Sequence, residues 1–281
     1  MKGSLIYLPE RGISLYVRIV GSGPPVLLMH GGLGADHSTL LALLPLAGQF
    51  QLIFYDHRAN GRSGGRAESL SWQSLADDAE ALRRHLGIGK WTVIGHSFGA
   101  CIALEYGLRH SKSCIKLVLL DGGAAAQQQQ AHRVLAEHGC GGSTLELARK
   151  FYNGNLDSGR FLLAVLILGR HYFAKPSPSR LLAEAMRGLR IRAKPAAASF
   201  GFKVLMAGWS VLARLPEIAI PTLVVAGQAD FLFPPAHQAI LAAGIPGAQL
   251  RILAGAGHNA HVEKARTVIR IVRQFLGQTT A

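Results

Sequence analysis

The segment at residues 91–104 limits the fold of this chain most strongly, because a strand, a sharp turn and a helix are predicted to follow one another there. The apolar run at 91–94 is rich in β-branched residues, which is typical of a buried strand. A Gly-x-Ser-x-Gly pentapeptide follows at 95–99, and the apolar stretch at 100–104 favours a helix. Tight strand-to-helix connections of this kind belong to parallel α/β sheets.

The serine at the centre of the pentapeptide is a candidate nucleophile. Gly95 and Gly99 remove the Cβ atoms that would clash in so sharp a turn, and the residue between them is expected to be strained. The Ser97 hydroxyl would then point into a cleft beside the N-terminus of the next helix. We therefore predict that Ser97 attacks a substrate carbonyl.

A serine nucleophile needs a base, and the base needs a group that orients it. Strands predicted at 222–227 and 249–253 are followed by Asp230 and by His258. Both residues would lie beyond the carboxyl ends of strands, where open α/β sheets keep their active sites. We predict that His258 takes the Ser97 proton and that Asp230 orients the imidazole.

Three alternatives stay open at this stage. Asp230 is also a suitable cap for the turn that follows it. Asp121, which follows the predicted strand at 116–120, is a rival acid, and His261 is a rival base only three residues after His258. We expect His261 to lie inside the final helix as a surface or packing residue.

A glycine-rich turn at 30–34 follows the predicted strand at 26–29 and is a candidate oxyanion hole. The backbone N–H groups of Gly32, or of Leu33 beside it, and of Phe98 are the predicted donors to a developing oxyanion. The alternatives are a plain glycine turn or a phosphate-binding loop. The second lacks the Gly-Lys-Ser/Thr ending that a phosphate loop requires.

The apolar periodicity predicts an α/β fold with a mostly parallel, twisted, eight-stranded sheet flanked by helices. The first two strands should form an antiparallel hairpin that turns at 9–12. The predicted strands cover residues 3–8, 13–20, 26–30, 51–55, 91–95, 116–120, 222–227 and 249–253. The predicted helices include residues 72–86, 98–109, 235–243 and 262–276, and the glutamines at 127–130 are expected on a helix.

These motifs together resemble the α/β-hydrolase family over nearly the whole chain. The resemblance rests on the turn at 30–32, the pentapeptide around Ser97, Asp230, His258 followed by Glu263, and a loop at 55–63. That loop is similar to the family's D-x-R-G-x-G-x-S segment, but Ala59 stands where the family has glycine. If the position needs a positive φ, alanine there costs about 1 kcal/mol. The resemblance implies a Ser–His–Asp hydrolase that needs no metal and no organic cofactor, without naming its substrate.

The interval from Asp121 to Pro221 holds about a hundred residues with helical patterns and no convincing strand. In the family that the chain resembles, an insertion here is usually a helical cap over the active site. We therefore divide the chain into a first core part at 1–121, an all-helical cap at 122–215 and a second core part at 216–281. Apolar residues predicted to line the substrate pocket are Leu33, Phe161, Val165 and Phe231.

The predicted reaction is hydrolysis of a small carboxylic ester or lactone with an apolar acyl or alkyl group, through an acyl-enzyme on Ser97. Residues 122–220 carry thirteen Lys or Arg and five Asp or Glu, which argues against a pocket for a substrate ammonium group. A proline iminopeptidase, which the loops at 30–32 and 55–63 also resemble, stays an alternative. So do a C–C bond hydrolase using the same three residues and a non-catalytic ligand receptor.

The composition excludes several other classes. The net charge is +14, but the chain has no nucleic-acid-binding motif and no run of five basic residues. No apolar run approaches the roughly 20 residues that span a membrane. The N-terminus lacks a signal-peptide pattern and the three cysteines lack metal or paired spacing, so a reducing cytoplasm is expected. Apolar cap surface could also pair two copies into a homodimer.

Overall fold

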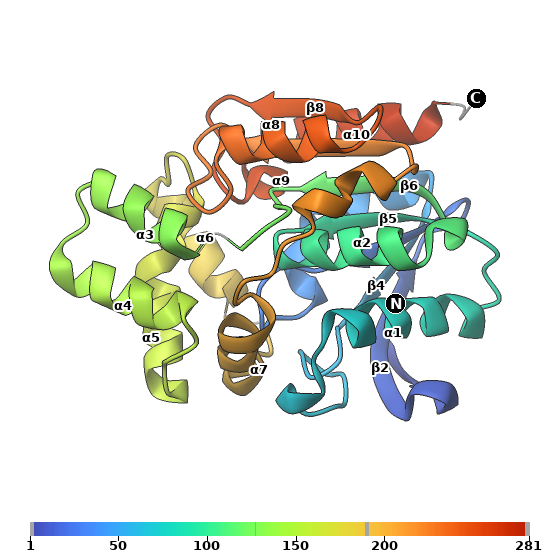
Figure 1. Ribbon diagram of the computed structural model, residues 1–281, viewed down its shortest axis with the longest axis horizontal. Coiled ribbons are helices and arrows are strands. Elements are labelled where there is room, and N and C mark those ends of the chain that lie inside the picture. Colours follow the sequence, from blue (N-terminus) through green and yellow to red (C-terminus); the bar gives the residue numbers. More distant parts are fainter. Residues whose placement is uncertain (1–2, 127, 189–190, 279–281) are drawn as a thin grey trace.

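The computed structural model describes residues 3–126, 128–188 and 191–278 and contains an eight-stranded sheet (Figure 1). Its order is β1-β2-β4-β3-β5-β6-β7-β8, with β2 antiparallel to β1 and β4 and the remaining neighbours parallel. This confirms the predicted sheet and its hairpin edge. The strands are β1 Ser4–Leu8, β2 Ile13–Val20, β3 Pro25–Met29, β4 Gln51–Tyr55, β5 Trp91–His96, β6 Cys114–Leu120, β7 Thr222–Gly227 and β8 Gln249–Leu253.

The sheet is covered on both faces, so every residue of the interior strands β5 and β7 is buried. Apolar side chains of α1, α2 and α8 pack into one buried cluster, and those of η2 and α10 pack into another. The bounds of these helices are α1 Trp72–His85, α2 Phe98–Arg109, α8 Pro235–Gly244, η2 His37–Gly48 and α10 Ala265–Gly277. The prediction of one continuous helix at 262–276 is wrong, because the structure contains two helices there.

The break falls at Lys264, between α9 (Ala260–Glu263) and α10, where φ is −121° and ψ is 39°. The carboxylate of Glu263 turns back to accept the backbone N–H groups of Gly257 at 2.6 Å and Ala174 at 3.1 Å. The first bond holds the short helix α9 against the loop before it, and the second holds it against a residue 89 positions earlier in the chain. The helical periodicity of the sequence contains no sign of them.

A helical insert, Ala124 to Val211, separates β6 from β7. Figure 1 shows α3, α4 and α5 grouped on one side of the molecule, away from the sheet. The two ends of the insert meet, since Val211 N–H donates to the Ala124 carbonyl at 2.8 Å and Ala126 N–H to the Trp209 carbonyl at 2.9 Å. The α-helices of the insert are α3 Gln128–Glu137, α4 Gly142–Tyr152, α5 Ser158–Gly169, α6 Pro178–Gly188 and α7 Pro195–Phe200.

Two expectations from the sequence can be compared with these bounds. The expected boundary at 215 falls inside the short helix η7 (Leu212–Glu217), so the structural neck lies a few residues earlier. Of the four glutamines expected on a helix, Gln128 to Gln130 begin α3 and Gln127 lies outside the described residues. Within the described parts of the chain, no helix is long and apolar enough to cross a membrane.

Candidate active site

Ser97 lies in the turn between β5 and α2, with φ 53° and ψ −120°. This positive φ is rare for a residue with a side chain and marks a strained turn. A Cβ atom on Gly95 would overlap the carbonyl of Gly99, and one on Gly99 would overlap the carbonyl of Met29. Both glycines of the pentapeptide are therefore required by close backbone packing.

A hydrogen-bonded chain joins Ser97, His258 and Asp230. The Ser97 Oγ lies 2.8 Å from His258 Nε2, and His258 Nδ1 lies 2.9 Å from Asp230 Oδ2. The other carboxylate oxygen of Asp230 accepts the backbone N–H groups of Leu232 at 2.8 Å and Phe233 at 3.0 Å. If the ring donates from Nδ1 to the carboxylate, Nε2 is left as the acceptor for the serine O–H.

Asp121 lies nearby but has different partners. Its two carboxyl oxygens accept the backbone N–H groups of Gly227 at 2.8 Å and Ala260 at 3.0 Å. Burial raises the pKa of the Asp121 carboxyl well above its usual range, and the charge of Asp230 adds to the rise. Asp121 therefore links the ends of β6, β7 and α9, while the carboxylate that reaches the His258 ring belongs to Asp230.

His261 and His96 pack behind His258. His261, expected inside the final helix, lies in α9 with its Nε2 3.0 Å from the Thr39 carbonyl. His96 Nε2 lies 3.1 Å from the His258 carbonyl, and burial, with the charges of His261 and His258, lowers the pKa of His96 well below its usual value. With Asp121 these rings place possible metal-ligand atoms within 4.8 Å of one another. Each residue already has a backbone hydrogen-bond partner.

Three backbone N–H groups that the sequence proposes for the oxyanion hole have no hydrogen-bond acceptor among the described residues: those of Gly32, Leu33 and Phe98. Gly32 has a φ of 71° at the tip of its turn. The next glycine of the turn is occupied, because Gly34 N–H donates to Asn60 Oδ1 at 2.7 Å. The structure thus leaves available the donors that the sequence proposes, and their role stays a prediction.

Two buried histidines support this turn from below. The rings of His30 and His57 lie 3.9 Å apart, and His57 Nε2 lies 3.1 Å from the His30 carbonyl. Burial lowers the pKa of both side chains, and that of His57 falls well below its usual value. Both rings are therefore neutral at pH 7, and they pack against each other with their planes tilted by 32°.

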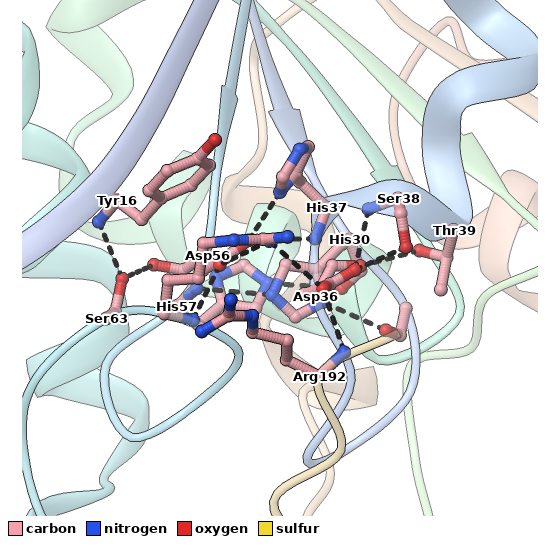
Figure 2. Close-up of polar contacts among 12 residues, drawn as sticks. Tyr16, His30, Asp36, His37, Ser38, Thr39, Asp56, His57, Ser63 and Arg192 are labelled. Carbon is pink, nitrogen blue, oxygen red and sulfur yellow. Dashed lines mark hydrogen bonds and ion pairs between the residues drawn. The ribbon is translucent and has the colours of Figure 1, made fainter. Parts of the chain in front are cut away.

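A buried polar network continues from this turn to the insert (Figure 2). Asp56 accepts the His37 ring Nδ1–H at 2.6 Å and the Arg62 backbone N–H at 2.8 Å. Asp36 accepts the Arg62 side chain at 3.2 Å and the Arg192 backbone N–H, from the insert, at 3.0 Å. Burial alone would raise the pKa of Asp56, but the hydrogen bonds from His37 and Arg62 and the electrostatic interaction with His30 together lower it.

Ala59 lies in the loop that carries this network, and its φ is 57°. Its N–H donates to the Gly64 carbonyl at 2.7 Å, which closes the loop. The strain expected for alanine at this glycine-like position is therefore present.

Aromatic rings surround His258. Tyr172 lies edge-on to it at 5.3 Å between ring centroids, and Phe233 lies at 5.9 Å. Phe231 packs against Tyr172 at 5.2 Å, one layer further out. Burial raises the pKa of Tyr172 to about 12, so its phenol is neutral at pH 7. The aromatic side chains on this side of His258 are therefore uncharged.

Trp72 contacts the ring of Phe98, next to Ser97, and sequence reasoning missed it. It stacks on Trp209 of the insert at 4.6 Å and lies 5.5 Å from the Phe98 ring. Its Nε1–H donates to the Leu205 carbonyl at 3.1 Å, which joins α1 to the insert. The only sequence signal is a tryptophan in the first turn of a helix that is otherwise polar on its outer face.

The residues predicted to line the pocket are found in different surroundings. Leu33 is buried against Gly201 of the insert, and Phe231 is buried beside Tyr172. Phe161 is buried inside the insert and stacks on Phe151 at 5.4 Å, whereas Val165 is 43% exposed on α5. Phe231 reaches His258 through one intervening ring, that of Tyr172, whereas Phe161 is several rings further away. The pocket roles of all four residues stay predictions.

The comparisons with known proteins agree with this architecture. The chain is 25% identical over 286 aligned positions to the proline iminopeptidase PfmaB of Pestalotiopsis fici, covering 96% of this chain and 98% of that protein. An esterase from Exiguobacterium antarcticum has a TM-score of 0.81 at 22% identity, covering 98% of this chain and 100% of its own. An enol-lactonase from Burkholderia xenovorans has a TM-score of 0.78 at 22% identity with the same coverage. The family model for the alpha/beta hydrolase fold matches residues 24–265, and the chain therefore belongs to the alpha/beta hydrolase family.

Proposed function

We propose that this protein is a serine hydrolase that cleaves a small carboxylic ester or lactone through an acyl-enzyme on Ser97. The observation that carries the proposal is the Ser97–His258–Asp230 chain, with its two links of 2.8 and 2.9 Å. A nucleophile, a base and an orienting carboxylate in this geometry are the parts that acyl transfer requires.

In the proposed reaction, His258 Nε2 takes the hydroxyl proton while Ser97 Oγ attacks the carbonyl carbon. The N–H groups of Phe98 and Gly32, or of Leu33, would stabilise the tetrahedral oxyanion. His258 then gives its proton to the leaving alcohol, and the acyl group stays on Ser97. A water molecule that gives its proton to His258 attacks the acyl-enzyme, and His258 returns that proton to Ser97 Oγ as the acid is released. The scheme needs no metal or organic cofactor.

The surroundings of His258 favour an apolar acyl or alkyl group. Tyr172 and Phe233 face the imidazole, and the Phe98 ring packs against Trp72 on the other side of the turn. Such walls bind hydrocarbon through the area they remove from water, at about 25 cal/mol per Å². They leave a charged substrate group without a partner.

A prolyl amide is the second substrate class to test, because the similar protein from Pestalotiopsis fici is named a proline iminopeptidase. A free substrate amine needs an acceptor, and three of the five acidic residues of 122–220 already pair with arginine: Glu146 with Arg149, Asp157 with Arg160 and Glu217 with Arg214. This pairing makes the ester reading the stronger one.

The test is hydrolysis of p-nitrophenyl esters of increasing acyl length by the wild type, Ser97→Ala and the exposed-serine control Ser143→Ala. We expect multiple turnovers in the wild type and the control, and a loss of at least about a thousandfold in Ser97→Ala. Equal rates in Ser97→Ala and the wild type would refute the nucleophile. A single slow turnover would favour a receptor, and an inert wild type that cleaves prolyl amides or dienoic keto acids would favour the alternatives.

A further inference from the structure

Helix α5 carries apolar surface that the described chain leaves uncovered. Phe161, Ala164 and Leu168 are buried in the insert. The remaining large side chains form what we call the α5 face, with exposed fractions from 37% to 67%: Leu162, Leu163, Val165, Leu166 and Ile167. These are five of the fifteen large apolar side chains exposed on the described surface, on a helix of twelve residues. Clustered exposure of this kind marks an interaction surface.

The width of the α5 face indicates what covers it. At about 100° per residue, the exposed apolar positions span about 200° of the helix circumference, and the buried ones span about 60°. A neighbouring protein helix covers an apolar stripe of roughly 100°. The α5 face is twice as wide as that stripe. Lipid acyl chains, which can flow around the helix, would cover it more completely than a single packed protein surface.

The net charge at the ends of the α5 face is positive. Arg160 and Arg170 are exposed at its two ends. Asp157, the acid closest along the chain, lies 3.7 Å from Arg160 and is exposed with it. Residues 122–220 as a whole are also positively charged, with thirteen basic and five acidic residues. Basic residues beside an apolar helix are complementary to anionic lipid headgroups, and each contributes about 1 kcal/mol near such a surface.

The length of α5 decides how it meets a bilayer. Twelve residues make a helix of about 18 Å, which is shorter than the hydrocarbon core of about 30 Å. The helix therefore suits the interface between headgroups and acyl chains, where apolar helices lie in the membrane plane. Arginines at both ends would keep their charged groups at the level of the phosphates.

We propose that the α5 face docks this protein on anionic lipid surfaces, with the apolar side chains inserted and Arg160 and Arg170 at the phosphates. The proposal goes beyond ester hydrolysis and stands independently of it, because lipid binding is measured without any substrate.

The test is sedimentation of the full chain with vesicles of phosphatidylcholine alone or with 30% phosphatidylglycerol, a composition of about one anionic lipid in three. The variants are Leu163→Ser/Leu166→Ser on the α5 face and Ile240→Ser as the control, since Ile240 is 53% exposed on α8. Thermal unfolding checks that both variants fold. Each exposed substitution is expected to change the free energy of unfolding by about 0.5 kcal/mol or less.

We expect the wild type and Ile240→Ser to bind the anionic vesicles, and the double variant to bind at least about tenfold more weakly. Arg170→Gln should lower the binding about fivefold. Three results would overturn the proposal: no vesicle binding by the wild type, binding that ignores lipid charge, or binding kept by the double variant. A wild-type dimer that becomes monomeric in the double variant, without vesicle binding, would assign the α5 face to a second copy.

Discussion

The carboxyl edge of the sheet and the outer helix of the insert use apolar residues in opposite ways. At the sheet edge, β5 and β7 are buried along their whole length, and the carboxyl groups of Asp121 and Asp230 are satisfied by protein partners. In α5, more than half of the helix circumference is apolar and exposed. The sheet edge is therefore complete within the chain, whereas α5 presents surface for something outside it. Substitutions should separate the two regions clearly.

The largest effect is expected at Asp230. Asp230→Asn keeps the shape of the side chain but cannot stabilise a His258 imidazolium, so kcat on the preferred ester should fall about 10⁴-fold. Asp121→Asn, its matched control, places an amide N–H₂ against backbone N–H groups. That change should cost about 1–3 kcal/mol of folding stability and change kcat by less than about tenfold. If folded Asp121→Asn lost more kcat than Asp230→Asn, Asp121 would be the orienting acid.

The next effect separates the two faces of α5. Phe161→Ala removes a buried ring that stacks on Phe151, so the free energy of unfolding should fall by about 3–5 kcal/mol. Val165→Ala, one turn away on the exposed face, should change it by about 0.5 kcal/mol or less. Urea unfolding followed by circular dichroism measures both. A similar loss in the two variants would mean that the α5 face is packed within a single copy.

Substitutions at two glycines test how tightly the backbone is packed in the turn around Ser97 and at the end of α5. Gly99→Ala places a Cβ against the Met29 carbonyl and should cost about 3 kcal/mol. Gly169→Ala, at the end of α5 where a Cβ meets nothing, should gain up to about 1 kcal/mol. The melting temperatures of the two variants should therefore shift in opposite directions. A tolerated Gly99→Ala would show that the turn around Ser97 can relax.

The smallest expected effect is the change in the free energy of unfolding with pH, which depends on the buried histidines near the sheet edge. His30, His57 and His96 have lowered pKa values in the folded protein, so they stay neutral while the unfolded chain takes up protons below its ordinary histidine pKa of 6.5. The free energy of unfolding should therefore fall as the pH drops below 6.5. The slope is at most about 1.4 kcal/mol per pH unit for each histidine.

Urea unfolding at pH 7.5, 6.5 and 5.5 tests this dependence. His96→Asn should reduce the slope, and His138→Gln, at an exposed position of the insert, should keep it. Equal stability at the three values of pH would mean that these rings take up protons in the folded protein as readily as in the unfolded chain.

The fold and the central residues of the candidate site are readable from the sequence because they depend on strand ends. Ser97, Asp230 and His258 each follow a short apolar run bounded by turn residues, and parallel strands bring such ends to one edge. The Trp72–Trp209 stack and the Asp36–Arg192 bond join residues far apart in the chain, so no local pattern predicts them. The exposed side of α5 is hidden for another reason: an apolar helix has the same sequence pattern whether protein or solvent surrounds it.

The neck of the insert has a consequence for how such an enzyme can diversify. Because Val211 and Ala124 are hydrogen-bonded at its base, everything between them is one continuous cassette with adjacent ends. Doubling the length of a segment closed in this way costs only about 0.6 kcal/mol of chain entropy. The insert can therefore change in length at a small cost in chain entropy, while the contacts that Trp209 and Arg192 make with the core limit which segments can replace it.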